Sequence, residues 1–187
     1  MLSKETLRRI DAFDASVDRS FDRLRGNPVA DRIFYGASAM GDHGLIWFLL
    51  GALRGARSEH DWKAAVRVGV SLATEAAVVN LGIKSLFRRS RPVSDAPRPY
   101  HLRRPRTSSF PSGHATAGFT AATLLADGDR LGPAYYALAA LVASSRVYVK
   151  IHHASDVVGG VVIGLGMGRL AGRLFPLAAD PILKEGP

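Results

Sequence analysis

The sequence predicts an all-α protein: a membrane helical bundle of about five transmembrane helices, preceded by an amphipathic N-terminal helix. Three observations predict it. Five apolar stretches rich in Gly and Ala follow one another after residue 32. Apolar residues in the first 25 positions recur at helical spacing. No segment shows convincing alternation of apolar and polar residues, the pattern of a strand. A soluble helical bundle remains an alternative, because the mean hydropathy is low for a membrane protein.

The length of the chain suits one domain. Its 187 residues are expected to form a single domain, 1–187, with an N-terminal helix over 1–28 and a helical bundle over 33–175. The chain contains no Cys, which excludes disulfides and thiolate metal sites.

Residues 3–25 are predicted to form an amphipathic helix. Its apolar face consists of Leu7, Ile10, Phe13, Val17, Phe21 and Leu24. Ser3 can cap its start, and Gly26-Asn27-Pro28 ends it. Both charge signs are mixed along it without an apolar core, so it is not a secretory signal. The helix either packs on the bundle or lies flat at a lipid interface.

The apolar stretches run approximately over 33–53, 65–83, 113–127, 132–146 and 156–175. Each is about long enough to cross hydrocarbon, although the third and fourth are short against the usual ~20 residues. Gly160 and Gly164 have the small-xxx-small spacing that lets helix backbones approach closely. Asp42, Glu75 and Asn80 lie within these stretches and should face the interior or lie near the helix ends, because a charge in mid-bilayer is costly.

The positive charge of the chain is local. Of the formal net charge of +9, most comes from residues 84–106, which hold eight of the 25 Lys and Arg residues. Such a cluster marks an anion site. Nucleic acid is not expected as a partner, because the cluster lies between apolar stretches and lacks interleaved aromatic residues. If the stretches alternate in direction, the loops 84–112 and 146–155 meet at the same end of the bundle.

Lys84 and Arg91 form the first of three motifs. They are seven residues apart and could share a helix face, and Pro92 favours a turn at Arg91. Both cations can bind phosphate oxygens. By themselves, they could equally be a basic helix end at the membrane interface.

The second motif is Pro111-Ser112-Gly113-His114. Pro and Ser are helix start signals, and Gly113 lets a ligand approach the backbone. The free amides of the first turn then form an anion site, with His114 placed for proton transfer. The alternative is an ordinary helix cap with an incidental His.

The third motif begins at Ser145-Arg146 and includes His152 and Asp156. If His152 lies in the first turn of the final helix, Asp156 is on the same face and can hold one ring nitrogen, leaving the other free to attack. His153 points about 100° away and lacks such a carboxylate. A metal site built on the two His residues and Asp156 is a further alternative.

These motifs resemble the signature of the type 2 phosphatidic acid phosphatase (PAP2) family, which includes lipid phosphate phosphatases, bacterial polyprenyl-diphosphate phosphatases and the related vanadium haloperoxidases. The family pattern is Lys-x6-Arg-Pro, Pro-Ser-Gly-His and Ser-Arg-x5-His-x3-Asp, and residues 84–156 match every position in order. The first helix departs from the family's six-span members, because it is charged rather than a full span.

The resemblance implies a role for each matching residue. His152 would be the nucleophile that forms a phosphohistidine, Asp156 would hold it, and His114 would protonate the leaving oxygen. The remaining positions would bind the phosphoryl oxygens: Lys84, Arg91, Ser112, Gly113 and Arg146. No metal and no cofactor are expected.

We therefore expect a PAP2-type phosphatase that hydrolyses a lipid phosphomonoester or diphosphate. A polyprenyl-linked phosphate is favoured, with decaprenyl-phosphoryl-phosphoribose as one candidate and phosphatidate or phosphatidylglycerophosphate as others. The expected location is the bacterial inner membrane, with the site on the extracytoplasmic side. Two alternatives are a vanadate-dependent haloperoxidase-like enzyme and a non-catalytic protein that binds anionic lipid. No protein partner is indicated.

Overall fold

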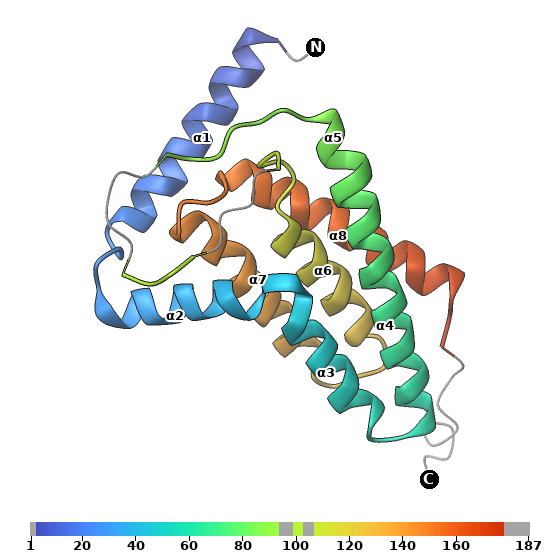
Figure 1. The fold of residues 1–187 in the computed structure, drawn as a ribbon. Helices are drawn as coiled ribbons and strands as arrows, with labels where there is room; N and C mark the ends of the chain where they lie inside the picture. The colour runs from blue at the N-terminus through green and yellow to red at the C-terminus, as the bar shows by residue number, and fades with distance from the viewer. Residues whose placement is uncertain (1–2, 94–98, 103–106, 178–187) are drawn as a thin grey trace.

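The computed structural model describes residues 3–93, 99–102 and 107–177, and this part of the chain is helical without strands (Figure 1). The all-α bundle predicted from the sequence is confirmed. The elements are α1 (Lys4–Asp22), α2 (Pro28–Met40), η1 (Asp42–Gly44), α3 (Leu45–Gly55), α4 (Glu59–Ala77), η2 (Val78–Ile83), α5 (Lys84–Leu86), α6 (Gly113–Leu125), α7 (Gly132–Tyr148) and α8 (Ala154–Leu174).

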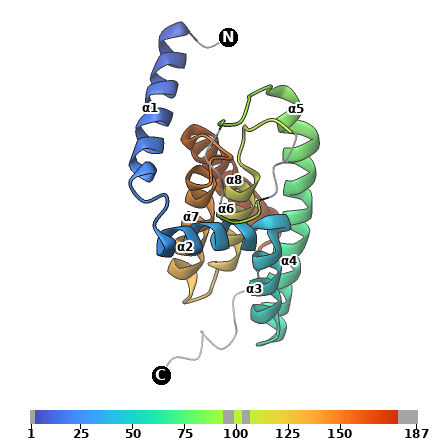
Figure 2. The ribbon, with the colours of Figure 1, turned by 60° about the vertical axis from the view of Figure 1, so that its left-hand side comes forward.

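The predicted N-terminal helix is present as α1. The side chain of Ser3 accepts a hydrogen bond from the amide of Thr6 at 3.1 Å, as expected of an N-cap. Near its end, Phe21 packs edge-on against Phe34 and Tyr148. Figure 2 shows α1 along one side of the bundle, where it contacts α7 and α8. Its C-terminal half therefore packs on the protein.

The apolar stretch 33–53 is not one helix. The chain turns at η1, and α2 and α3 run in different directions on either side of it (Figures 1 and 2). In this turn the backbone is in the left-handed region at His43, with φ 56°, and at Gly44, with φ 71°. A periodicity of apolar residues does not show such a break, because both halves keep a helical pattern. The break brings Asp42 to the rim of the bundle core rather than into the middle of a span.

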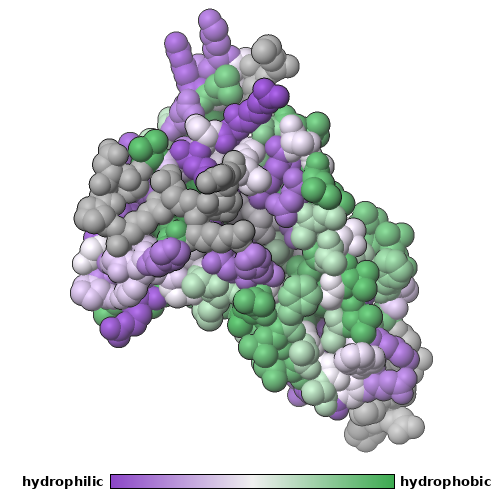
Figure 3. Space-filling model, viewed as in Figure 1, coloured by the Kyte–Doolittle hydropathy of each residue, from purple (hydrophilic) through white to green (hydrophobic). Residues whose placement is uncertain are grey.

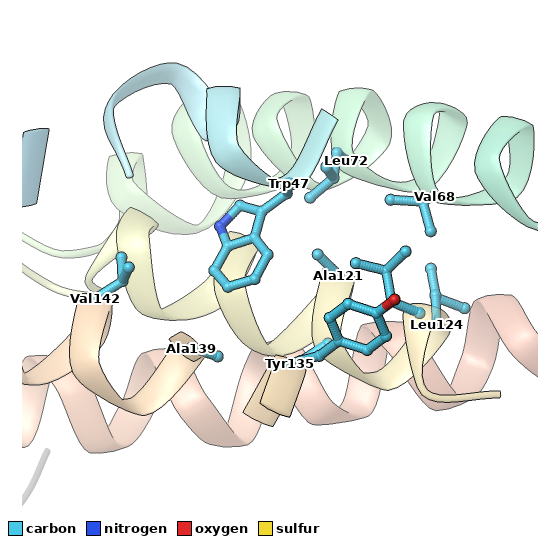
Figure 4. Close-up of a cluster of buried hydrophobic side chains, with 10 residues drawn as sticks. Trp47, Val68, Leu72, Ala121, Leu124, Tyr135, Ala139 and Val142 are labelled. Carbon is cyan, nitrogen blue, oxygen red and sulfur yellow. The ribbon is translucent and has the colours of Figure 1, made fainter. Parts of the chain in front are cut away.

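The apolar core lies between α3, α4, α6 and α7 (Figure 4). Trp47 of α3 is completely buried and extends toward α6 and α7, and Val68 and Leu72 of α4 complete the layer with Leu124. This core joins the four helices and fixes their relative positions.

Glycines bring α6 and α8 into close contact. A Cβ added at Gly160 would lie 2.7 Å from the carbonyl oxygen of Ser112, and one at Gly164 would lie 2.5 Å from that of Thr116. The small-xxx-small spacing of the sequence thus produces the expected backbone approach. Because Ser112 precedes α6, this contact also sets the distance between the second and third motifs.

Two helices of the described chain are long and apolar enough to cross a membrane, Glu59–Leu86 and Ala154–Leu174. The helices α6 and α7 are shorter, with 13 and 17 residues. Figure 3 shows apolar side chains gathered over α3 and α4, between more polar ends. The exposed apolar residues of α3, α4 and η2 include Leu45, Leu49, Leu53, Val66, Val70 and Leu81. An apolar belt of this kind is the surface that lipid covers.

Candidate active site

The three motifs lie together at one end of the bundle. The amide of Ser112 donates to the carbonyl oxygen of Asp156 at 3.1 Å. The position that a Cβ at Gly113 would take is 3.5 Å from Lys84 Nζ. Arg91 Nη1 lies 3.1 Å from His152 Nε2. Residues far apart in the sequence therefore form a single site, which the alternation of the apolar stretches predicted.

Lys84 and Arg91 do not share a helix face. The helix continues from α4 through a π-helical turn, Val78–Ile83, and ends at Leu86, so Arg91 lies in a segment without regular secondary structure. Lys84 Nζ donates to Asn80 Oδ1 at 3.0 Å. Arg91 turns inward, as Pro92 predicted, and donates to the carbonyl oxygens of Thr107, Ser108 and Ile151. The two cations therefore reach the site from a helix end and from the segment that follows it, and not from one face of a helix.

Ser112 and His114 begin α6. Ser112 is the N-cap residue and is completely buried, and its Oγ has no hydrogen-bond partner among the described residues. A buried hydroxyl of this kind is suited to a ligand oxygen. His114 Nε2 donates to the carbonyl oxygen of Ser38 at 3.0 Å and lies 3.2 Å from Asp42 Oδ1. A Cβ at Gly41 would be only 2.6 Å from this imidazole, so the glycine gives the ring its space.

Arg146 lies at the end of α7 and is 1% exposed. Its guanidinium donates to the hydroxyl of Ser38, the residue whose carbonyl oxygen accepts from His114. Its own carbonyl oxygen accepts from the amides of Ile151 and His152, both at 3.1 Å. The chain folds back over the helix end through a left-handed residue, Lys150, with φ 53°. Arg146 thus links the His114 side of the site to His152.

The structure places His152 just before α8, not within its first turn. The helix begins at Ala154 with His153 as its N-cap residue. Asp156 Oδ2 accepts from the amide of His153 at 2.9 Å and lies 3.6 Å from His152 Nδ1, beyond hydrogen-bond distance. The carboxylate therefore faces the expected ring nitrogen but, in this state, is bonded elsewhere.

The contacts of His152 define its protonation. A guanidinium can only donate, so the Nε2 atom beside Arg91 carries the lone pair. Burial of the ring, reinforced by the positive charges of Arg91 and Arg146, lowers the pKa of His152 to about 3, against the opposing effect of Asp156. His152 is consequently a neutral imidazole at physiological pH, with its lone pair directed toward the cations.

A cavity of ≈ 310 Å³ adjoins His114, Gly113 and Lys84. Its other walls come from η1, α3, α4 and η2 and include polar and apolar side chains: His43, Phe48, Leu72, Glu75 and Asn80. Glu75 faces the interior, as predicted for a charged residue in an apolar stretch, and accepts from the hydroxyl of Thr116. Within the described parts of the chain, no group of three His, Asp or Glu residues is arranged to hold a metal ion.

Four residues of this site were not found from the sequence: Ser38, Asp42 and Arg89, and Asp14 of α1. Arg89 Nη1 donates to Asp156 Oδ1 at 2.6 Å, and Arg89 Nη2 to Asp14 Oδ2 at 2.6 Å. The only signals in the sequence were the charge of Asp42 inside an apolar stretch and the two further arginines, Arg88 and Arg89, inside the first motif. The arginines at 98, 103, 104 and 106 lie outside the described residues.

Comparison with known proteins is decisive. The sequence-family model of the PAP2 superfamily matches residues 64–178 of the chain. The chain belongs to the PAP2 superfamily. It is accordingly a phosphatase, a phosphoric ester hydrolase, and the resemblance found in its three motifs is confirmed.

Relatives within the superfamily agree with this assignment. The chain is 36% identical over 138 residues to decaprenylphosphoryl-5-phosphoribose phosphatase of Mycobacterium tuberculosis, an alignment that covers 72% of this chain and 75% of that protein. The crystal structure of Aquifex aeolicus LpxE has a TM-score of 0.68 at 25% identity and covers 85% of this chain and 94% of LpxE.

The fold is also that of a transmembrane PAP2-type phosphatidylglycerolphosphate phosphatase from Bacillus subtilis. The TM-score is 0.67 at 21% identity, over 92% of this chain and 87% of the other. The bundle is thus a membrane-protein fold, in agreement with the apolar belt over α3 and α4.

Proposed function

We propose that this PAP2 protein hydrolyses a phosphate ester at the end of a polyprenyl-linked lipid, without a metal ion, through a phosphohistidine on His152. Decaprenylphosphoryl-5-phosphoribose is the first candidate substrate, because the M. tuberculosis relative carries that name and the alignment covers most of both chains. The observation that carries the mechanism is the hydrogen bond from Arg91 to His152 Nε2, which identifies the nitrogen with the lone pair.

In the first step, His152 Nε2 attacks phosphorus and forms an N–P bond. The bond from phosphorus to the ester oxygen breaks, and its electron pair stays on that oxygen. His114 donates a proton to the oxygen, and the alcohol leaves. The carbonyl oxygen of Ser38 and the carboxylate of Asp42 both face His114 Nε2 and stabilise the protonated imidazole.

The positive charges of the site bind the phosphoryl oxygens. Lys84, Arg91 and Arg146 supply the cations, while the Ser112 hydroxyl and the Gly113 amide supply hydrogen bonds at the start of α6. As attack proceeds, negative charge spreads over the equatorial oxygens, where these groups are already in place. Asp156 moves onto His152 Nδ1 and stabilises the positive charge that develops on the ring.

In the second step, water attacks the phosphohistidine. His114, now neutral, accepts a proton from the water, and the N–P bond breaks with its electron pair returning to His152 Nε2. Inorganic phosphate leaves, and both histidines regain their starting states. One water is consumed for each ester bond broken.

The cavity beside His114 and Lys84 receives the leaving group. Its polar side, at Glu75 and Asn80, suits the hydroxyls of a sugar, and its apolar side, at Phe48 and Leu72, leads toward the lipid-facing helices. A lipid whose phosphorylated head is followed by a polar group and then by a hydrocarbon chain fits this order.

Phosphate release from detergent-solubilised protein in EDTA tests the proposal. Phosphoribosyl-polyprenyl, polyprenyl-diphosphate and glycerolipid phosphates should be compared at equal concentration. We expect turnover in EDTA, fastest with the first substrate. A strict metal requirement, or no turnover of any lipid phosphate, would overturn it, and a preference for glycerolipid would overturn the substrate assignment.

We further propose that the protein lies in the bacterial inner membrane with its site on the extracytoplasmic side. Because the chain contains no Cys, single cysteines can report the side. Arg88→Cys lies at the site end and Ala56→Cys at the turn between α3 and α4, and both positions are exposed. An impermeant maleimide added to intact spheroplasts should label the first alone. Labelling of the second alone would reverse the orientation.

A further inference from the structure

The amphipathic helix α1 buries an unexpected residue. Asp14 is its one buried side chain, 7% exposed, whereas Leu7 and Phe13 are 48% and 45% exposed. Removing a carboxylate from water is costly unless it is bonded or paired. A buried carboxylate beside exposed apolar side chains indicates that a polar contact of Asp14 holds α1 to the bundle.

Asp14 makes three close contacts. Its Oδ1 accepts from the amide of Ser155 at 2.7 Å, and its Oδ2 from the hydroxyl of Ser155 at 2.8 Å. Its Oδ2 also accepts from Arg89 Nη2 at 2.6 Å. The carboxylate thus caps the start of α8, where the helix dipole favours negative charge, and holds one arm of a guanidinium.

The other arm of the guanidinium reaches the catalytic pair. Arg89 Nη1 donates to Asp156 Oδ1 at 2.6 Å and to the hydroxyl of Ser155 at 2.7 Å. The second oxygen of Asp156 faces His152 Nδ1 at 3.6 Å. Four side chains therefore form a continuous series from α1 to the proposed nucleophile: Asp14, Arg89, Asp156 and His152.

Asp14 affects this series electrostatically. An Arg89 that pairs with Asp156 alone would draw electron density from that carboxylate and make it a weaker acceptor for His152 Nδ1–H. With Asp14 on its other arm, the guanidinium is shared between two carboxylates. Asp156 then keeps more of its negative charge for the imidazolium that forms during attack.

We propose that Asp14 is a positioning residue for the phosphatase reaction, acting through Arg89 on Asp156, so that α1 is part of the catalytic assembly. This inference rests on the proposed role of His152. It extends the site to a helix outside the matched segment 64–178, where the three motifs give no signal.

Asp14→Asn tests the inference, because it keeps the size of the side chain and removes its charge. We expect kcat to fall about 10- to 100-fold, the factor typical of one charge-assisted hydrogen bond, with KM changed by less than about twofold. Formation of the phosphoenzyme in a single turnover should slow by the same factor. Combined with Arg89→Gln, the substitution should cause little further loss.

Asp18→Asn is the matched control. Asp18 also ties α1 to the rest of the chain, through Arg25 at 2.6 Å and Lys150 at 3.2 Å, but it does not contact Arg89. If Asp18→Asn lowered kcat as much as Asp14→Asn, attachment of α1 would be the whole effect and the inference would be wrong. An unchanged kcat in Asp14→Asn would also overturn it. Full activity of His152→Ala would instead refute the proposed function.

Discussion

His152 and His114 belong to one site, yet their ring nitrogens face groups of opposite kinds. The Nε2 atom of His152 accepts from a guanidinium, so it carries a lone pair. The Nε2 atom of His114 donates to the carbonyl oxygen of Ser38 and lies beside the carboxylate of Asp42, so it carries a proton. The difference supports the proposal that His152 is the nucleophile and His114 the acid.

The contrast also predicts that the two identical side chains are not interchangeable. Their helices, α6 and α8, are held together by glycines, and Arg146 links them through Ser38 and the loop before α8. Each imidazole is therefore fixed in its own electrostatic environment before any substrate arrives. The two rings begin the proposed reaction with different partners, a guanidinium at His152 and a carbonyl oxygen at His114.

The largest expected effect is that of His152→Ala. Removing the nucleophile should lower kcat by about 10⁴-fold or more, since the remaining groups only bind and polarise the phosphate. The loss should be the same for a lipid phosphate and for an aryl phosphate, because both need attack at phosphorus. The measurement is phosphate release from purified protein. His153→Ala serves as the neighbouring control and should retain most activity.

His114→Ala should behave differently with the two substrates. We expect a loss of about 10²- to 10⁴-fold with a lipid phosphate, whose alkoxide leaving group needs a proton. With an aryl phosphate, whose leaving group is stable as an anion, formation of the phosphoenzyme should be much less affected. Burst kinetics measure that step directly. Equal losses with both substrates would contradict the division of roles between the two histidines.

Gly164→Ala should separate the helices that carry the two histidines. Its Cβ would lie 2.5 Å from the carbonyl oxygen of Thr116, so the backbones must move apart. We expect a loss of about 1–3 kcal/mol in unfolding free energy, typical of overpacking, seen as a lower midpoint in thermal unfolding. Gly166→Ala is the matched control, since nothing lies within 4 Å of its added Cβ. Equal behaviour of the two variants would show that α6 and α8 are not in this contact.

The last prediction concerns pH. Burial lowers the pKa of His152 to about 3, whereas an imidazole in the unfolded chain has its usual value near 6.5. As pH falls from 6.5 toward 3, the unfolded chain binds a proton that the folded chain does not, so folding stability decreases. The unfolding midpoint of His152→Gln should therefore fall less between pH 6.5 and 4 than that of the wild type. A steeper fall in the variant would show that His152 is protonated in the folded state.

Much of the site could be predicted because its residues lie at the ends of apolar stretches, which the sequence shows clearly. Lys84, Ser112, Arg146 and His152 all lie at or beside helix ends on the same side of the bundle. The π-helical turn before Lys84 and the break at His43 could not be predicted. In both places the apolar pattern continues, and the change depends on backbone geometry alone.

The residues that contact the motif residues could not be predicted from the sequence either. Asp14 lies on a helix whose spacing predicts an apolar buried face, so a buried carboxylate there has no local signal. Ser38 serves the site partly through its backbone oxygen, which any residue type would provide. Arg89 is one of several arginines in a basic segment, and only its two carboxylate contacts distinguish it.

Identification of the covalent intermediate tests the account most directly. Protein mixed with a ³²P-labelled lipid phosphate and quenched in alkali within one turnover should carry the label on His152, as an N–P bond that survives base and is lost in acid. With a ³²P-labelled aryl phosphate, whose leaving group needs no proton, His114→Ala should accumulate the same species, because its breakdown lacks a base. Label on any other residue, or no label in a variant that still turns over, would contradict the central claim.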